Sequence, residues 1–162
     1  MNKDDVFWMQ KALALAEQAA GNQEVPVGAV VVIDDEIVGQ GCNAPIGSCD
    51  PTAHAEVLAI RDACERVGNY RLPEATLYVT IEPCTMCTGA IVHARLKRVV
   101  FGAIEPKAGA VVSQNQLLDH PAMNTSVEVT QGVLAEESSC IISSFFALRR
   151  EKKKALKQAA KS

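Results

Sequence analysis

The sequence contains no long apolar run, no secretion signal and no overall excess of positive charge. None of its apolar stretches reaches the roughly 18 residues that a transmembrane helix needs. Asp4 and Asp5 lie where a signal peptide would carry positive charge, and Lys11 and Glu17 interrupt the apolar residues that follow. The formal net charge of −3 argues against a uniformly basic nucleic-acid-binding protein. We therefore expect a cytoplasmic protein with no membrane partner.

Internal repeats, low-complexity segments and linkers are also absent, so we expect one domain spanning residues 1–162. A hydrophobic content of 48% with 22% charged residues is ordinary for a globular protein of this length, which can bury a sizeable core. The six cysteines are unevenly spaced and lie mostly in apolar runs. This pattern favours reduced thiols in a cytosol over a disulfide framework.

Positive charge is concentrated at the C-terminus. Residues 149–162 hold seven lysines and arginines against one acidic residue, Glu151, a local charge of +6. The first 148 residues carry nine basic and eighteen acidic residues, a charge of −9. This asymmetry indicates an anionic partner near the C-terminus. A solvated helix end, whose lysines suit the helix dipole, is the alternative that the tail leaves open.

Two short segments carry residues suited to metal chemistry: His54-Ala-Glu56 and, after 26 further residues, Pro83-Cys84-x-x-Cys87. A histidine and two cysteines are ligands that zinc prefers, and catalytic zinc sites keep three protein ligands and leave a fourth position for water. A glutamate is a hard donor beside two thiolates, so Glu56 is better suited to move a proton between water and a leaving group. The combined pattern is typical of zinc nucleobase deaminases.

Two other interpretations of these cysteines remain open. A closed structural zinc site would need a fourth ligand, and Cys49, five residues before His54, is the best candidate. A redox pair at Cys84 and Cys87 is the second alternative. The upstream His-x-Glu and the proline before the first cysteine favour the catalytic interpretation.

Periodicity and capping residues predict an alternation of helices and strands. We expect helices over about 4–21, from 50–51 to 68, from 83–84 to 93–95 and from 136 to about 157, and strands at 25–33, 36–42, 76–81, 98–102 and 127–130. This order predicts a three-layer α/β/α sandwich around a mixed sheet of about five strands, with residues 43–47 in a loop and a basic C-terminal helix. Both metal half-sites then lie at helix N-termini and can converge on one sheet edge.

His54 and Glu56 place a constraint on the second expected helix. Side chains two positions apart in a regular helix point about 200° apart around its axis. Both side chains can reach one metal ion only if the ion lies beyond the N-terminal end of this helix and the Glu56 side chain turns back towards it. The helix dipole at that end would stabilise a developing anion.

Longer strings of residues agree in type and order with one family. On these strings the chain resembles the bacterial tRNA-specific adenosine deaminases from about Val6 to Arg150. The resemblance implies a cytidine deaminase-like fold, a homodimer, one zinc ion per chain, and conversion of the wobble adenosine in the anticodon loop of an arginine tRNA to inosine. The strings lie at residues 24–30, 43–47, 50–56, 69–72, 75–80, 82–87, 89–91, 98–103, 120–121, 145–146 and 149–150.

The resemblance also implies roles for single residues. It makes His54, Cys84 and Cys87 the zinc ligands and Glu56 the proton shuttle. Asn43 would contact the flipped base or its sugar, although an asparagine that merely supports its loop is an alternative. Glu105 stands where members of the family usually carry a shorter acid, often aspartate, and we expect it to take that place beside the anticodon loop.

Two rival functions share parts of this pattern. The first is a small-molecule nucleobase or nucleotide deaminase such as guanine deaminase, because residues 50–57 suit that activity too. The second is a non-enzymatic zinc-stabilised RNA-binding module, in which Glu56 would be idle. The basic C-terminal helix and the strings after Cys87 favour tRNA over the small-molecule substrate, and the RNA-binding module remains open.

Overall fold

A computed structural model describes residues 3–161 and contains the mixed five-stranded sheet that the sequence predicts. The strand order is β2-β1-β3-β4-β5. β1 pairs antiparallel with β2 and with β3, whereas β3, β4 and β5 run parallel. The strands are β1 (Gly28–Ile33), β2 (Glu36–Cys42), β3 (Thr76–Ile81), β4 (Arg98–Ala103) and β5 (Glu128–Thr130).

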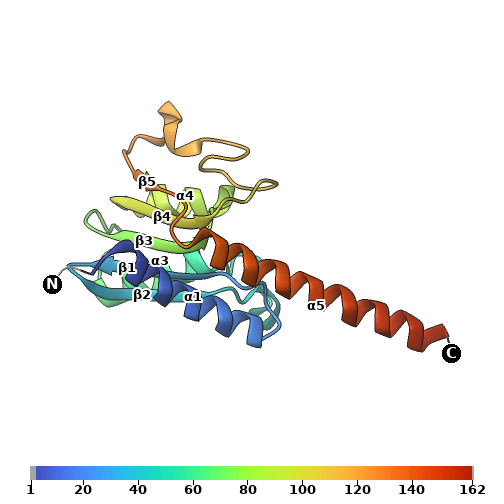
Figure 1. Cartoon of the computed structure of the whole chain (residues 1–162). Coiled ribbons are helices and arrows are strands. Elements are labelled where there is room, and N and C mark those ends of the chain that lie inside the picture. The colour runs from blue at the N-terminus through green and yellow to red at the C-terminus, as the bar shows by residue number, and fades with distance from the viewer. Residues whose placement is uncertain (1–2, 162) are drawn as a thin grey trace.

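Helices cover both faces of this sheet and complete the three layers (Figure 1). α1 (Asp5–Gly21) and the beginning of α5 (Ala135–Lys161) pack on one face. α3 (Ala55–Val67) packs on the other face, and α4 (Thr85–His93) lies beside it. Three shorter helical segments lie in connections: α2 (Pro45–Ser48), η1 (Leu117–Asp119) and η2 (Pro121–Met123).

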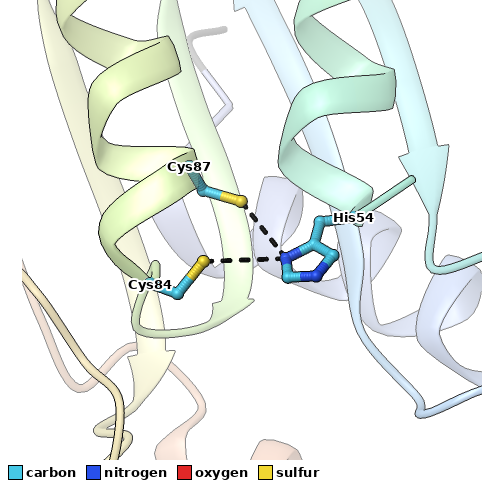
Figure 2. Close-up of side chains that lie close together, drawn as sticks. All are labelled: His54, Cys84 and Cys87. Atoms are coloured by element: carbon cyan, nitrogen blue, oxygen red, sulfur yellow. Dashed lines mark hydrogen bonds between the residues drawn. The ribbon is translucent and has the colours of Figure 1, made fainter. Parts of the chain in front are cut away.

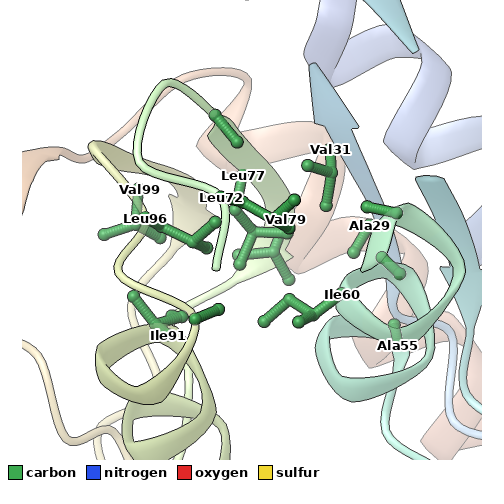
Figure 3. Packing of buried hydrophobic residues seen from close by; sticks show 14 of the residues in the cluster. Ala29, Val31, Ala55, Ile60, Leu72, Leu77, Val79, Ile91, Leu96 and Val99 are labelled. Atoms are coloured by element: carbon green, nitrogen blue, oxygen red, sulfur yellow. The ribbon is translucent and has the colours of Figure 1, made fainter. Parts of the chain in front are cut away.

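Successive side chains of a strand point to opposite faces of the sheet, so the strands contribute to two hydrophobic cores, one on each face. The larger core, seen in Figure 3, joins Val31, Leu77 and Val79 of the sheet to Ile60 of α3 and Ile91 of α4. The smaller core joins the even-numbered residues of β1, β3 and β4 to α1, and its members include Trp8, Met9, Ala12, Val30, Val32, Tyr78 and Val100. The larger core therefore fixes α3 and α4 beside one another, and these two helices carry the predicted metal ligands.

A glycine lets α3 approach the sheet closely. A Cβ atom on Gly41 of β2 would lie 2.7 Å from the carbonyl oxygen of Ala55, the first residue of α3. Real Cβ atoms do not approach this closely, so a larger residue would push the start of α3 away. The position of the neighbouring His54 therefore depends on the absence of a side chain at Gly41.

The predicted start of this helix was wrong by several residues. We expected it at Asp50 and Pro51, but α3 begins at Ala55. The Asp50 carboxylate instead accepts hydrogen bonds from the main-chain N–H of Thr52 at 2.9 Å and from its hydroxyl at 2.7 Å, which closes a local turn. His54 is consequently the extended residue that precedes the helix (φ −78°, ψ 150°), so the angle expected between His54 and Glu56 does not apply.

The C-terminal helix confirms the prediction of a helix from about residue 136 and extends beyond it. α5 runs for 27 residues and projects from the rest of the chain (Figure 1). Ser138 is its only fully buried residue, and residues 151–161 are exposed throughout. None of the helices in the described part of the chain is both long enough and apolar enough to cross a membrane.

Candidate active site

His54, Cys84 and Cys87 meet at the ends of two neighbouring helices (Figure 2). The Nδ1 atom of His54 lies 3.7 Å from the Sγ atom of Cys84 and 3.5 Å from that of Cys87. A tetrahedral zinc ion with ordinary Zn–N and Zn–S bonds requires N···S separations of about 3.6 Å. The three ligand atoms therefore have both the chemistry and the spacing for zinc.

The arrangement of strands and helices explains why these residues converge. Cys84 follows β3 after two residues and is the N-cap residue of α4, and Cys87 lies in the first turn of that helix. His54 has the same N-cap position on α3. The three side chains therefore lie at two helix N-termini, and main-chain N–H groups in the first turn of α4 donate to Cys84 and favour its thiolate over its thiol.

The two thiols differ in acidity. Hydrogen bonds from the Cys87 thiol and from the main-chain N–H groups of Cys87 and Met86 lower the pKa of Cys84 to about 5, against the effect of burial. The Cys87 thiol donates the first of these bonds and is buried, and both effects raise its pKa. Cys84 is therefore the more acidic of the two thiols, and a metal cation bound here would displace the proton of Cys87.

Glu56 lies in the first turn of α3 and is 3% exposed. Burial raises the pKa of its carboxyl group, although hydrogen bonds from its own main-chain N–H and from Cys87 oppose the shift. Glu56 does not belong to the single cluster of metal-type ligands among residues 3–161. A buried carboxyl group with a raised pKa beside such a cluster has the properties of a general acid and base.

A cavity of about 180 Å³ adjoins the metal ligands, and we refer to it as the catalytic cavity. It brings together five of the six predicted site residues; the sixth, Cys87, is fully buried and is not one of the residues that line it. The residues that line it are Val25, Val27, Asn43, His54, Glu56, Ile81, Glu82, Cys84, Glu105 and Ala108.

Asn43 lines this cavity and also supports α3. Its Oδ1 atom accepts a hydrogen bond from the main-chain N–H of Ala55 at 2.8 Å. The side-chain oxygen is therefore engaged by the helix, and the NH₂ group is the part of the amide that can serve a ligand.

Glu105, also at the cavity, has a different set of bonds. Its main-chain N–H donates to the Oε1 atom of Glu82 at 3.0 Å, and its own Oε1 atom accepts from the main-chain N–H of Lys107 at 3.0 Å. One carboxylate oxygen thus holds the local turn. The predicted place of Glu105 in the site is consistent with these contacts, while its role towards a substrate stays a prediction.

The proposed fourth ligand, Cys49, does not join the others. It is exposed, and its thiol lies 3.8 Å from the carbonyl oxygen of Ile46. The cluster of metal-type ligands in residues 3–161 comprises His54, Cys84 and Cys87 alone. The chain therefore supplies three ligands to this site, the number that catalytic zinc sites use.

The contacts of two buried carboxylates were not predicted from the sequence: Glu82, which lines the cavity, and Glu24, which precedes the lining residue Val25. Glu24 accepts hydrogen bonds from the main-chain N–H groups of Ile46 and Gly47 at 3.1 and 2.7 Å. Glu82 accepts them from the segment that contains Glu105. Burial would raise the pKa of Glu82, but these hydrogen bonds outweigh it and lower the pKa. A charged residue placed directly after an apolar strand was the available signal for Glu82.

Comparison with known proteins identifies the family. Residues 2–103 match the cytidine and deoxycytidylate deaminase zinc-binding region. A tRNA-specific adenosine deaminase of Haemophilus influenzae is 53% identical over 98% of this chain and 92% of its own length. A structure from work on A-to-I editing by tRNA:A34 deaminases at the wobble position has a TM-score of 0.81, with 44% identity over 83% of this chain and 97% of that chain.

A guanine deaminase structure from Nitrosomonas europaea has a TM-score of 0.78 at 19% identity, over 91% of this chain and 86% of that chain, so it shares the fold alone. The much higher identity to the tRNA-specific relatives extends over nearly the whole chain. The chain belongs to the cytidine and deoxycytidylate deaminase family, and within it to the tRNA-specific adenosine deaminases.

Proposed function

We propose that this protein hydrolytically deaminates the wobble adenosine of a tRNA anticodon loop to inosine, using one zinc ion per chain. The observation that supports this most strongly is the placement of buried Glu56 in one cavity with two of the three zinc-type ligands. A structural zinc site would not need a general acid and base there, because it carries out no proton transfer. Membership of the tRNA-specific adenosine deaminases supports adenosine as the target base.

His54, Cys84 and Cys87 would hold the zinc ion, which when bound activates a water molecule for attack on the base. Glu56 would take one proton from the attacking water and deliver it to the ring nitrogen N1. It would then take the second proton from the hydroxyl group at C6 and deliver it to the departing amine. The C6–N6 bond breaks, a C6–O bond forms, and ammonia leaves. The raised pKa of Glu56 suits a group that both accepts and releases a proton near neutral pH.

The chain's own cavity residues would bind and orient the adenosine. The NH₂ group of Asn43 can donate a hydrogen bond to a ring nitrogen or a sugar oxygen. The cavity encloses only about 180 Å³, so the base must leave its stack to enter it. A single-stranded anticodon loop makes that extrusion inexpensive compared with a duplex.

We further propose a cytoplasmic, homodimeric enzyme with one catalytic domain that acts on an arginine tRNA. These points rest on the family resemblance and on the reduced, free cysteines. The exposed basic residues of α5 offer an electrostatic surface for phosphates, although residues 151–161 form no part of the catalytic cavity.

The substrate class can be tested by comparing an unmodified anticodon stem-loop with free adenosine, guanine and cytosine. If binding to the stem-loop positions the base, free adenosine should be a very poor substrate in both rate and affinity. Turnover of guanine or cytosine at a rate comparable to the stem-loop would instead identify a small-molecule deaminase. Absence of all turnover by the zinc-loaded protein would favour a non-enzymatic RNA-binding module.

A further inference from the structure

We propose that Glu82 is a positioning residue that holds one wall of the catalytic cavity, residues 105–113, in place for substrate binding. The identity of the substrate in this proposal rests on the proposed function. Glu82 follows β3 directly, and its side chain is 2% exposed. We refer to residues 105–113 as the cavity wall, because Glu105 and Ala108 within this segment line the cavity.

The Glu82 carboxylate is the main attachment point of this wall. Its Oε1 atom accepts hydrogen bonds from the main-chain N–H of Glu105 at 3.0 Å and from the Ser113 hydroxyl. Its Oε2 atom accepts from three successive main-chain N–H groups, those of Val111, Val112 and Ser113, at 3.1, 2.8 and 2.9 Å. Five donors thus converge on one carboxylate.

The wall contains no regular secondary structure whose hydrogen bonds could hold it in place without Glu82. Residues 104–113 contain turns and irregular backbone but no helix or strand. Main-chain N–H groups need partners when they are shielded from water, and hydrogen bonds to a carboxylate are stronger than those to a neutral acceptor. The wall therefore depends on Glu82 for partners that regular secondary structure would otherwise provide.

Gly109 provides independent evidence that the wall is fitted around this carboxylate. A Cβ atom at Gly109 would lie 2.3 Å from the Cδ atom of Glu82 and 2.4 Å from each of its oxygens. The backbone of the wall consequently passes directly over the carboxylate. The next residue, Ala110, donates its main-chain N–H to the carbonyl oxygen of Pro83 at 2.9 Å, which strengthens the same attachment.

These contacts also separate Glu82 from a direct role in the reaction. A carboxylate offers about four lone-pair positions, and five protein donors already occupy those of Glu82. Glu82 therefore acts through the wall, by fixing where Glu105 and Ala108 meet the substrate. Loss of this fixation should weaken binding and leave the chemical step nearly intact.

The test is Glu82→Gln, which has nearly the same shape but presents a donor where one oxygen was. At least one main-chain N–H of the wall then loses its partner. Loss of a hydrogen bond to a charged group lowers the fraction of molecules whose wall is in place, and apparent affinity falls with that fraction. KM for the anticodon stem-loop should therefore rise at least about tenfold. The kcat per bound zinc ion should stay within about threefold. Amide hydrogen exchange at residues 105 and 111–113 should become faster.

Gly109→Ala disrupts the same contact between the wall and the Glu82 carboxylate from the side of the wall, and it should raise KM in the same way. Because both substitutions release one attachment, their combined effect should be smaller than the product of the separate effects. Asp5→Asn is the matched control: it also alters a carboxylate with several hydrogen-bond partners, but Asp5 lies on α1 outside the cavity. It should lower stability without changing KM.

An unchanged KM in both Glu82→Gln and Gly109→Ala would overturn the proposal, as would a loss of kcat proportional to lost zinc. If Glu82→Gln does not fold, the KM of Gly109→Ala alone tests the proposal: a raised KM supports it, and an unchanged KM overturns it. If the wild-type protein does not deaminate the stem-loop, the proposed function fails, and hydrogen exchange still decides the role of Glu82. Unchanged protection of residues 105 and 111–113 in a folded Glu82→Gln variant would contradict it.

Discussion

The Oδ1 atom of Asn43 accepts a hydrogen bond from the main-chain N–H of Ala55 at 2.8 Å. Asn43 thereby provides a capping interaction for α3 from twelve residues away. The capped residue, Ala55, directly follows His54, one of the proposed zinc ligands. The same side chain lines the catalytic cavity. The oxygen of this amide therefore supports α3, and its NH₂ group remains available to a ligand in the cavity.

Two substitutions at Asn43 should separate these functions. Asn43→Asp keeps an oxygen for Ala55 but replaces the NH₂ donor, so stability should be preserved while KM for the stem-loop rises about tenfold or more. Asn43→Ala loses both groups and should also lower the free energy of unfolding by about 1 kcal/mol. Thermal denaturation and steady-state kinetics provide the two measurements. If Asn43→Asp has the wild-type KM, Asn43 supports α3 but does not contribute to substrate binding.

The metal site can be tested by substituting a proposed ligand and a non-ligand cysteine. Cys87→Ser should lose most of its zinc, because a hydroxyl group is a poor replacement for a thiolate. Cys49→Ser should retain one zinc ion per chain, since Cys49 is exposed and lies outside the ligand cluster. Metal analysis of the purified proteins measures both. Loss of zinc in Cys49→Ser would instead support a closed structural zinc site with Cys49 as its fourth ligand.

A further prediction concerns stability in acid. Arg98 hydrogen-bonds to Asp5 and holds the pKa of that carboxyl below its usual value. A lowered pKa contributes stability that is fully present above the unfolded-state value of about 3.9 and is lost as the pH falls through the folded-state pKa. Asp5→Asn should therefore be less stable than wild type at neutral pH, and the difference should shrink below about pH 4. Urea denaturation at several pH values measures this, and a constant difference down to about pH 2 would contradict the assignment.

Removal of the chain after Arg150 tests whether the basic helix end contacts RNA. Each phosphate contact with single-stranded RNA contributes about 0.7 to the slope of log affinity against log salt. The truncated protein should bind tRNA more weakly, with a slope reduced by roughly one to three units, while zinc content and single-turnover chemistry at saturating tRNA stay nearly unchanged. An unchanged slope in a folded truncation would identify a solvated helix end.

The clustering of His54, Cys84 and Cys87 was predictable because it depends on residue types and short spacings. His54, Glu56, Cys84 and Cys87 lie in two compact motifs, and the helix N-termini that carry them follow from local patterns. The order of strands and helices was predictable for the same reason. Strong periodicity and turn residues are local signals.

The errors and omissions concern interactions between distant parts of the chain. Asp50 and Pro51 resemble a helix start, but Asp50 is engaged by Thr52 and Asn43 supplies the capping acceptor from across the loop. The contacts of Glu82 reach residues 23 to 31 positions away. No local pattern contains that information, because the partners are brought together only by the packed fold.

In the function proposed above, Glu56 moves the protons in a zinc-dependent deamination of a wobble adenosine. The most direct test incubates unmodified arginine tRNA with zinc-loaded wild type and with zinc-loaded Glu56→Ala, followed by nucleoside analysis of the product. Wild type should replace the wobble adenosine with inosine, and the variant should retain its zinc but react at least about 10²-fold more slowly. No inosine from the zinc-loaded wild type, or equal rates from both proteins, would contradict the account.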